Sequence, residues 1–272
     1  MTLTKSIETG QVNRSAADVY EEFFVPALFQ RWTEPVAQAA QVKQGDDVLD
    51  IACGTGVLAR RLAARVGKAG KVTGLDINDG MLDIARKHLS SIFWRQGDAE
   101  ALPFDDNRFD AVVCQFGLMF FQDRKQALRE MVRVLRPGHK LAVAVWDTLD
   151  NTPGYAATSG LLHRLFGASV AESLRSPYVL GDTKVLVELF NQPGLSEVLI
   201  DTREGLAEFD SIEDWMHTDI RGWTLAGILD DDQYALLLKE AKAALKKFVG
   251  SDGRVVFKAP AHIVTGTKSL AV

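Results

Sequence analysis

Short apolar runs alternate along residues 46–146 with segments whose apolar side chains recur every three or four positions. The runs are nearly continuous in apolar character, which is typical of parallel strands covered on both faces. The segments between them have the spacing of helices that bury one stripe. We therefore predict strands at 48–52, 72–75, 92–95, 111–114 and 141–146. We predict the intervening helices at 57–66, 81–89 and 127–135.

Local signals mark the ends of two of these helices. Asn78 is the expected N-cap of the second helix, and Pro137-Gly138 is the expected stop of the third. Alternating strands and helices imply an open parallel sheet with right-handed crossovers, wound on both faces.

The flanking regions add helices and two further strands. Residues 15–42 and 150–190 have mostly helical patterns, and long strands are predicted at 196–209 and 254–267 around a helical insert of about forty residues. The prediction is one domain with a seven-stranded, mostly parallel, doubly wound α/β sheet. Its parts are an N-terminal helical lid segment (1–44), an α/β core (45–150), a helical insertion (151–195) and the last two strands with their insert (196–272).

Charge and composition narrow the range of partners. The chain has 31 Lys and Arg against 36 Asp and Glu, a net charge of −5, and its one basic run, 239–247, has the spacing of a solvated helix face. Nucleic acid is therefore not an expected partner. Residues 1–20 lack a leader pattern, and no run approaches the roughly 18 apolar residues of a membrane span. The cysteines, Cys53 and Cys114, adjoin predicted strands and have no metal-ligand spacing, so we expect reduced thiols and a cytoplasmic protein.

The loop after the first predicted strand has the features of a ligand site. Gly54 and Gly56 permit a tight turn and a close approach of a ligand to the backbone. Asp50, at the end of the strand, can reach a cationic amino group. Asp76 closes the second strand twenty residues after Gly56, where a carboxylate can accept hydrogen bonds from the hydroxyls of a ribose.

Two other interpretations of this loop stay open. The glycines can serve only to pack a helix closely on the sheet. Gly54, Gly56 and Ala59 also fit the dinucleotide pattern G-x-G-x-x-A, which would indicate an NAD-dependent oxidoreductase. Asp50 argues against a dinucleotide, because a carboxylate there would face a pyrophosphate. It favours a ligand that carries an ammonium group, such as S-adenosylmethionine.

Four segments together resemble a known family. Residues 49–56 resemble motif I of the class I S-adenosylmethionine-dependent methyltransferases. Residues 76–86, 97–104 and 109–113, with the Leu-Arg-Pro-Gly turn at 135–138, resemble the later motifs of the methyltransferase type 11 or ubiquinone/menaquinone-type group. The likeness spans about residues 45–146. Ala52 replaces the first glycine of motif I, and His139 replaces a usual glycine after Pro137.

The resemblance implies a Rossmann-like methyltransferase fold, S-adenosylmethionine as cofactor and S-adenosylhomocysteine as product. It implies that Asp50 holds the amino end of the methionine, that Asp76 holds the ribose, and that Asp98 accepts from the adenine amino group. The other implied contacts come from the backbone and from apolar side chains along the cofactor. These residues are Ala52, Cys53, Gly54, Gly56, Ile77, Met81, Ala99, Gln115 and Phe116.

The acceptor side is less defined. A small molecule methylated at O, N or C is expected to bind beyond the carboxyl ends of the strands, near Met119 and Trp146. Tyr20 and Trp32 belong to an aromatic N-terminal segment that either closes over the cofactor as a lid or simply packs on the domain. The candidates for a general base are Asp147, His163 and His217.

Three further points concern metal binding, catalytic activity and oligomeric state. Gln115 stands where a metal site would favour a carboxylate, so no metal is expected. A non-catalytic protein that binds S-adenosylmethionine remains an alternative, because the fold needs no fixed catalytic triad. The oligomeric state is left open.

Overall fold

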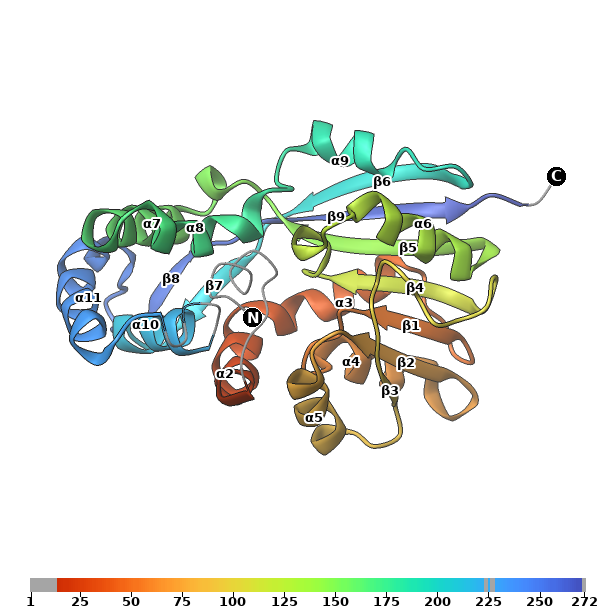
Figure 1. The fold of residues 1–272 in the computed structure, drawn as a ribbon, viewed down its shortest axis with the longest axis horizontal. Coiled ribbons are helices and arrows are strands. Elements are labelled where there is room, and N and C mark those ends of the chain that lie inside the picture. The colour runs from red at the N-terminus through yellow and green to blue at the C-terminus, as the bar shows by residue number, and fades with distance from the viewer. Residues whose placement is uncertain (1–13, 223–224, 226–227, 271–272) are drawn as a thin grey trace.

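The computed structural model describes residues 14–222, 225 and 228–270. A seven-stranded sheet in the order β3-β2-β1-β4-β5-β9-β6 forms its centre (Figure 1). The five strands β1 to β5 pair in parallel, and β9 runs antiparallel to both β5 and β6. The strands of this sheet are β1 (Asp47–Ile51), β2 (Lys71–Asp76), β3 (Phe93–Gln96), β4 (Phe109–Gln115), β5 (Leu135–Trp146), β6 (Leu195–Arg203) and β9 (Ala261–Lys268). The predicted sheet is confirmed.

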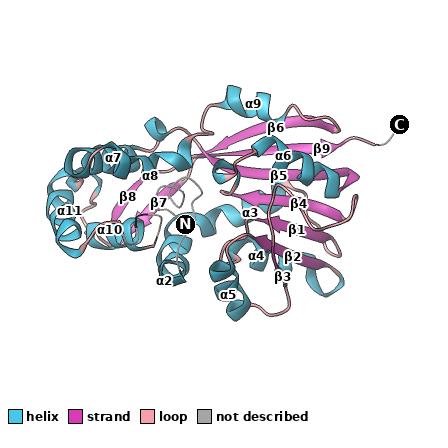
Figure 2. Cartoon of the chain, in the orientation of Figure 1, coloured by secondary structure: helices cyan, strands magenta, loops and turns pink. Residues whose placement is uncertain are grey.

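Helices cover both faces of the sheet (Figure 2), because each buries an apolar stripe of the predicted spacing. Helix α3 contacts α4, and α6 contacts α9. The helices that line the sheet are α3 (Thr33–Ala39), α4 (Val57–Val66), α5 (Asp79–His88), α6 (Arg124–Val134) and α9 (Thr183–Phe190). Asn78 caps α5 as predicted, since its side chain accepts a hydrogen bond from the backbone N–H of Met81.

The two long C-terminal strands of the prediction are each broken in two. The first divides into β6 and β7 (Leu206–Phe209), and the second into β8 (Val255–Lys258) and β9; β7 and β8 form a separate antiparallel pair. The breaks lie side by side, where the N–H of Ala259 donates to the carbonyl of Gly205. Pro260 has no N–H to continue a ladder. A Cβ at position 205 would overlap the ring of Trp32, so this corner depends on glycine.

The β7–β8 pair belongs to a helical lobe at one end of the sheet (Figure 1). Its helices are α7 (Pro153–Phe166), α8 (Ala168–Arg175), α10 (Ile212–Arg221) and α11 (Asp231–Ala244), with the short turn η6 (Ser176–Tyr178). The N-terminal helix α2 (Arg14–Val19) and the wide helical turn η1 (Tyr20–Phe29) lie between this lobe and the sheet, and η1 contacts β7 and α10. The helical character predicted for 15–42 and 150–190 is confirmed.

The predicted role of Pro137-Gly138 as the stop of the third helix is wrong. Helix α6 ends at Val134, and Leu135 already pairs with Phe109 of β4. Regular pairing resumes between Ala111 and Lys140, so Pro137-Gly138 forms an irregular turn within the start of β5, with Gly138 at φ +77°. A stop signal for a helix and a turn inside a strand use the same residues, which explains the error.

Candidate functional site

The chain reverses its winding between β1 and β4, which are neighbours in the sheet although β2 and β3 follow β1 in sequence. In open α/β sheets, ligands occupy the crevice beyond the carboxyl ends of strands at such a point. The segments that follow β1 and β4 lie close together there, since a Cβ at Gly117 would meet the Cβ of Ala52. The residues that leave β1 and β4 therefore form the base of the candidate site.

Two non-glycine residues at this point have left-handed backbone conformations. Ala52 follows β1 with φ +53°, and Phe116 follows β4 with φ +57°. Such conformations are unfavourable for residues with a Cβ and tend to gather at functional sites. The two residues are among the cofactor contacts that the sequence predicts, and the structure brings them to the same crevice.

Asp50 is a buried carboxyl at the end of β1. It is 1% exposed, and neither oxygen accepts a hydrogen bond from the described residues. Burial raises the pKa of this carboxyl well above its usual range, and the charge of Asp76 raises it further. The backbone N–H of Ala59 lowers the pKa but lies outside the geometry of a full hydrogen bond. A cationic group of a ligand would satisfy these oxygens and restore the ionised form.

Asp76, at the end of β2, organises the loop that follows β1. Its Oδ2 accepts the backbone N–H of Gly54 and its Oδ1 accepts that of Asn78, each at 2.8 Å. Burial raises the pKa of Asp76, and these amides act against the rise. Each carboxylate oxygen has a further lone pair, so Asp76 can accept ligand hydroxyls while it holds the loop.

The two glycines of the loop differ in their surroundings. A Cβ at Gly54 would meet nothing within 4 Å, which leaves the backbone open to a ligand. A Cβ at Gly56 would overlap the indole of Trp94, whose Nε1 donates to the carbonyl of Leu89. Gly56, at φ +87°, is therefore required by packing against β3 as well as by the turn.

The other predicted cofactor contacts lie around the same crevice. Ile77, just after β2, is 52% exposed. Asp98 is exposed, and its Oδ1 accepts the N–H of Glu100. Gln115 donates to the carbonyl of Phe29, while its Oε1 is buried and accepts no hydrogen bond from the described residues. The remaining contacts, Cys53, Met81 and Ala99, are buried.

Arg60 of α4 ties the N-terminal segment to the glycine loop, which the sequence patterns did not reveal. Its guanidinium donates to the carbonyl of Thr55 at 2.7 Å and to Oε1 of Glu21 at 2.7 Å. His88 of α5 lies 3.4 Å from the same Glu21 oxygen. Glu21 thus joins η1 to two helices that border the crevice.

Tyr20 and Ala17 extend the contacts of the N-terminal segment to α5. They pack with Met81 and Ile84 in a small apolar cluster. Burial raises the pKa of Tyr20, and the charge of Asp76 raises it further. The N-terminal segment thus packs against α5, the helix that follows β2.

An aromatic cluster links the crevice to the helical lobe. Phe116 stacks on Trp146, with ring centroids 3.8 Å apart, and Phe29 of η1 packs against both rings at 5.6 and 5.9 Å. Trp32 meets Trp146 edge-on and is 2% exposed, so it is a core side chain. Met119 is equally buried.

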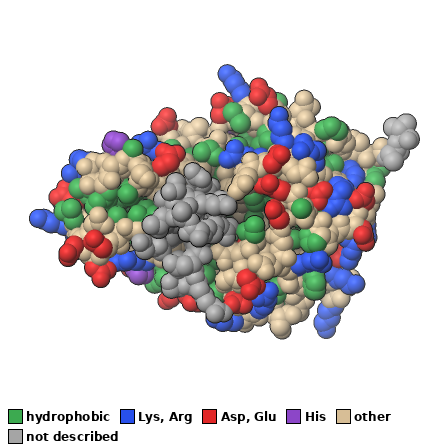
Figure 3. Space-filling model, in the orientation of Figure 1, with side chains coloured by type: hydrophobic (Ala, Val, Ile, Leu, Met, Phe, Trp, Pro, Cys, Tyr) green, Lys and Arg blue, Asp and Glu red, His purple; other side chains and the backbone are tan. Residues whose placement is uncertain are grey.

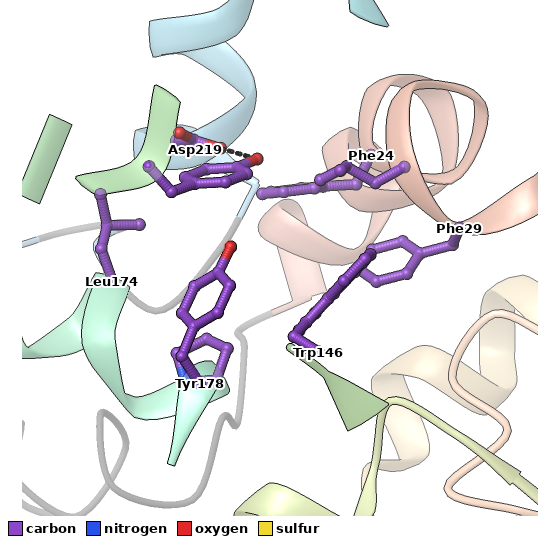
Figure 4. Close-up of a pocket in the computed structure, with 9 residues that line it drawn as sticks. Phe24, Phe29, Trp146, Leu174, Tyr178 and Asp219 are labelled. Carbon is purple, nitrogen blue, oxygen red and sulfur yellow. Dashed lines mark hydrogen bonds between the residues drawn. The ribbon is translucent and has the colours of Figure 1, made fainter. Parts of the chain in front are cut away.

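A pocket that is partly open to solvent lies beyond this cluster (Figure 4). Its walls are largely aromatic, and Asp219 provides its carboxyl group. Figure 4 shows Trp146 and Phe29 on one side and Asp219 and Leu174 on the other. The lining residues are Phe24, Leu28, Phe29, Trp146, Tyr155, Leu174, Pro177, Tyr178 and Asp219.

The three predicted base candidates do not line this pocket. Asp147 accepts hydrogen bonds from the N–H of Thr148 and from the side chain of Asn151, and lies 3.3 Å from His262. His163 is exposed, and His217 packs its ring against Phe23. The carboxylate of Asp147 is thus engaged in hydrogen bonds with its neighbours, and the two histidines lie in surroundings other than the pocket.

Asp219 was missed, although a signal for it was present. Ile212, Trp215, Met216 and Ile220 mark the buried stripe of α10, and Asp219 falls within it. A carboxyl at an apolar position of an amphipathic helix must be buried, and such groups are candidates for function.

The ligand that this geometry fits is S-adenosylmethionine. Asp50 offers a buried carboxyl without a partner, Gly54 offers an open backbone, and Asp76 offers free lone pairs. Across the described ranges of the chain, no group of three or more His, Cys, Asp or Glu side chains could hold a metal ion. Nor does any helix there have the length and apolar character to cross a membrane.

The fold and the site define the class of the S-adenosylmethionine-dependent methyltransferases. The chain belongs to the ubiE/COQ5 methyltransferase family, whose model matches residues 10–177. It methylates a small-molecule acceptor. The family assignment decides against the NAD-dependent oxidoreductase and the non-catalytic binding protein, which were the two alternative functions.

Relatives in three bacteria support the assignment. The chain is 36% identical to the ubiquinone/menaquinone biosynthesis C-methyltransferase UbiE of Hahella chejuensis over 194 residues, 65% of this chain and 78% of the relative. It is 35% identical to UbiE of Chromobacterium violaceum, covering 78% and 91%. The demethylmenaquinone methyltransferase of Listeria welshimeri is 32% identical, covering 73% and 92%.

Solved structures share the fold at low identity. Phosphoethanolamine N-methyltransferase 2 of Haemonchus contortus, in complex with S-adenosyl-L-methionine, is 17% identical with a TM-score of 0.63, over 99% of this chain and 60% of that one. The YcgJ protein of Bacillus subtilis, also 17% identical, has a TM-score of 0.57 over 89% and 99%.

Proposed function

We propose that this enzyme methylates a carbon atom of a hydroxylated aromatic ring. The observation that carries the proposal is the aromatic pocket, which adjoins Phe116 through the stacked ring of Trp146. Flat aromatic walls suit a planar acceptor. The relatives support a ring acceptor, because they are named for C-methylation in ubiquinone and menaquinone biosynthesis and for demethylmenaquinone.

The residues around the crevice have defined roles in this proposal. When bound, S-adenosylmethionine supplies an electrophilic methyl group on its sulfonium. Asp50 pairs with the ammonium of the methionine, Asp76 accepts from the ribose, and Asp98 accepts from the adenine amino group. Ile77 and Met81 cover the adenine. Phe116 and Trp146 separate the donor from water, and the aromatic walls fix the ring for in-line attack.

Binding and product analysis test this function. Calorimetry is expected to detect S-adenosylhomocysteine and not NAD. With S-adenosylmethionine and 1,4-dihydroxynaphthalene under anaerobic conditions, we expect a product with a new carbon-bound methyl group by NMR. Methylation at oxygen alone, or no turnover of any hydroxylated ring, would contradict the proposal.

The surface supports a small-molecule acceptor over a polyanion. Figure 3 shows basic and acidic side chains interspersed over the face it presents of the described chain. Binding of nucleic acid would need clustered Lys and Arg. We place the enzyme in the cytoplasm, with support from the free, buried thiols of Cys53 and Cys114.

We also propose that residues 15–32 act as a lid that closes over the cofactor and that the contacts of Glu21 hold this lid closed. Removing the Glu21 carboxylate by Glu21→Gln should weaken the contacts to Arg60 and His88 and let the segment open more often. We expect faster amide exchange in residues 15–32 and about threefold to tenfold weaker binding of S-adenosylhomocysteine.

The matched control is Glu22→Gln, which changes the exposed neighbouring residue on the same turn. It should leave exchange and affinity unchanged. In the wild-type protein, ligand should slow exchange in this segment. Equal exchange with and without ligand would mean that the segment is ordinary core.

A further inference from the structure

Among the described residues that line the pocket, only Asp219 carries a carboxyl group, and it is completely buried. The hydroxyl of Tyr155 donates to its Oδ1 at 3.1 Å. Its Oδ2 accepts no hydrogen bond from the described residues. A buried carboxyl with an unpartnered oxygen is costly, so its burial beside a pocket indicates a role toward a ligand.

The electrostatic surroundings tune this carboxyl for proton transfer near neutral pH. Burial raises the pKa of Asp219 and outweighs Tyr155 and the indole of Trp215, which lower it, so that the pKa is about 8. The Trp215 N–H lies outside the geometry of a full hydrogen bond. Tyr155 and Tyr178 are the titratable groups that face Asp219 from α7 and η6. Burial raises the pKa of each above its usual range, so neither loses its proton near pH 8.

The position of Asp219 complements that of the cofactor crevice. Figure 4 shows it across the pocket from Trp146, whose ring stacks on Phe116 at the end of β4. A hydroxylated ring in this pocket would have one hydroxyl at Asp219. Charge that develops on this oxygen is delocalised to the ring carbons ortho and para to it. In 1,4-dihydroxynaphthalene the para carbon carries the second hydroxyl, so the ortho carbon is the one that can accept the methyl group and regain aromaticity.

We propose that Asp219 is the catalytic base of the methyl transfer, and that its Oδ2 binds a hydroxyl of the aromatic acceptor and takes its proton. The inference rests on the proposed function. The O–H bond breaks and its electron pair enters the ring. The ring carbon forms a C–C bond with the methyl group as the S–CH₃ bond breaks. Water then takes the proton on that carbon as the C–H electron pair restores the aromatic ring, and Asp219 returns its proton to the ring oxygen.

The family match ends at residue 177, before η6 is complete and before α10 begins. The base therefore comes from the part of the chain outside that match. Tyr155, which holds Oδ1, is a positioning residue.

The test is the pH dependence of methylation of 1,4-dihydroxynaphthalene by wild-type protein and by Asp219→Asn. General-base catalysis contributes about 10²–10⁴-fold, so we expect kcat of Asp219→Asn to fall at least 100-fold with KM within about threefold. Wild-type kcat should rise with pH through a midpoint near 8, because the base must be ionised, and this rise should be absent in Asp219→Asn.

Two further variants separate catalysis from structure. Tyr155→Phe removes a hydrogen bond that lowers the pKa of Asp219, so its midpoint should move to higher pH while S-adenosylhomocysteine binding stays unchanged. Asp210→Asn, at an exposed ion pair with Arg254 just before α10, is the control and should retain the wild-type profile. If Asp219→Asn does not fold, the shift in Tyr155→Phe still decides the question.

The outcomes distinguish the two proposals. If wild-type protein methylates the ring and Asp219→Asn retains the rate and pH profile, the assignment of the base is overturned and the proposed function stands. A change in KM with unchanged kcat would also overturn it, because Asp219 would only bind. If wild-type protein methylates no hydroxylated ring, the proposed function fails, and the base with it.

Discussion

Asp50→Asn is expected to stabilise the ligand-free protein and to abolish its tight binding of S-adenosylhomocysteine. The pKa of Asp50 is raised in the folded state, so folding retains a proton that the unfolded chain releases above about pH 4. The free energy of unfolding therefore falls as pH rises from that point toward the folded pKa. An amide has no such dependence, so the free energy of unfolding of the variant should exceed that of the wild-type protein at pH 7.

The same change removes the charge that pairs with the ammonium of the ligand. Loss of a buried, charge-assisted contact of this kind costs about 2–5 kcal/mol, so affinity should fall at least thirtyfold. Thermal unfolding at pH 6 to 8, with and without S-adenosylhomocysteine, measures both effects. The melting temperature of the free variant should rise by a few degrees, and the ligand should no longer raise it.

Asp110→Asn, on β4, is a matched control for which we expect the opposite change in the free energy of unfolding. Burial raises the pKa of Asp110, but the Asp47 amide and Arg136 outweigh this and hold the pKa below its usual value. The Asp110 carboxylate stabilises the folded protein above the pKa that it has in the unfolded chain. This stabilisation is lost as the pH falls through the pKa that it has in the folded protein. Asp110→Asn should therefore destabilise the protein and leave ligand binding intact. Wild-type affinity in Asp50→Asn would remove Asp50 from the site.

The positions of the strands were predictable because they follow from local patterns. Buried parallel strands have continuous apolar runs, and crossover handedness and family motifs then restrict the topology. The break at Gly205 and Pro260 was not predictable with the same ease. It depends on Trp32, more than 170 positions earlier in the sequence, whose ring fills the space that Gly205 leaves. Apolar alternation runs through 254–267 regardless of which sheet each half joins.

The cofactor crevice was predictable for the same reason as the strands. Asp50, Gly54 and Asp76 lie in short motifs, and the fold brings the ends of β1 and β2 together. The acceptor pocket was not predictable from the sequence, because its walls come from η1, β5, α7, α8, η6 and α10. Glu21 and Arg60 meet across 39 positions, and Tyr155 and Asp219 across 64. Contacts of this range follow from packing and carry no local signature.

The largest stability effect is expected at Gly56, whose substitution separates packing from ligand contact within one loop. A methyl group at Gly56 would overlap the indole of Trp94, and φ +87° is unfavourable for alanine. Backbone strain of about 1–2 kcal/mol and overpacking of about 1–3 kcal/mol should together lower the free energy of unfolding of Gly56→Ala by about 2–5 kcal/mol.

Gly54→Ala should give the opposite pattern. Its φ is +54°, so strain costs about 1–2 kcal/mol, but the space beside it is open and no packing is lost. That space is where we expect the ligand to touch the backbone, so S-adenosylhomocysteine should bind at least tenfold more weakly. Urea unfolding and calorimetry on both variants give the two quantities.

A double-mutant cycle then identifies the cause of the loss in Gly56→Ala. Trp94→Leu alone should destabilise the protein by leaving a cavity beside Gly56. In its presence, the alanine methyl group at position 56 has room, so the second substitution should cost about 1–3 kcal/mol less than it does in the wild-type background. Full additivity of the two changes would show that the indole does not oppose the methyl group. The requirement for glycine at position 56 would then come from the turn and the ligand.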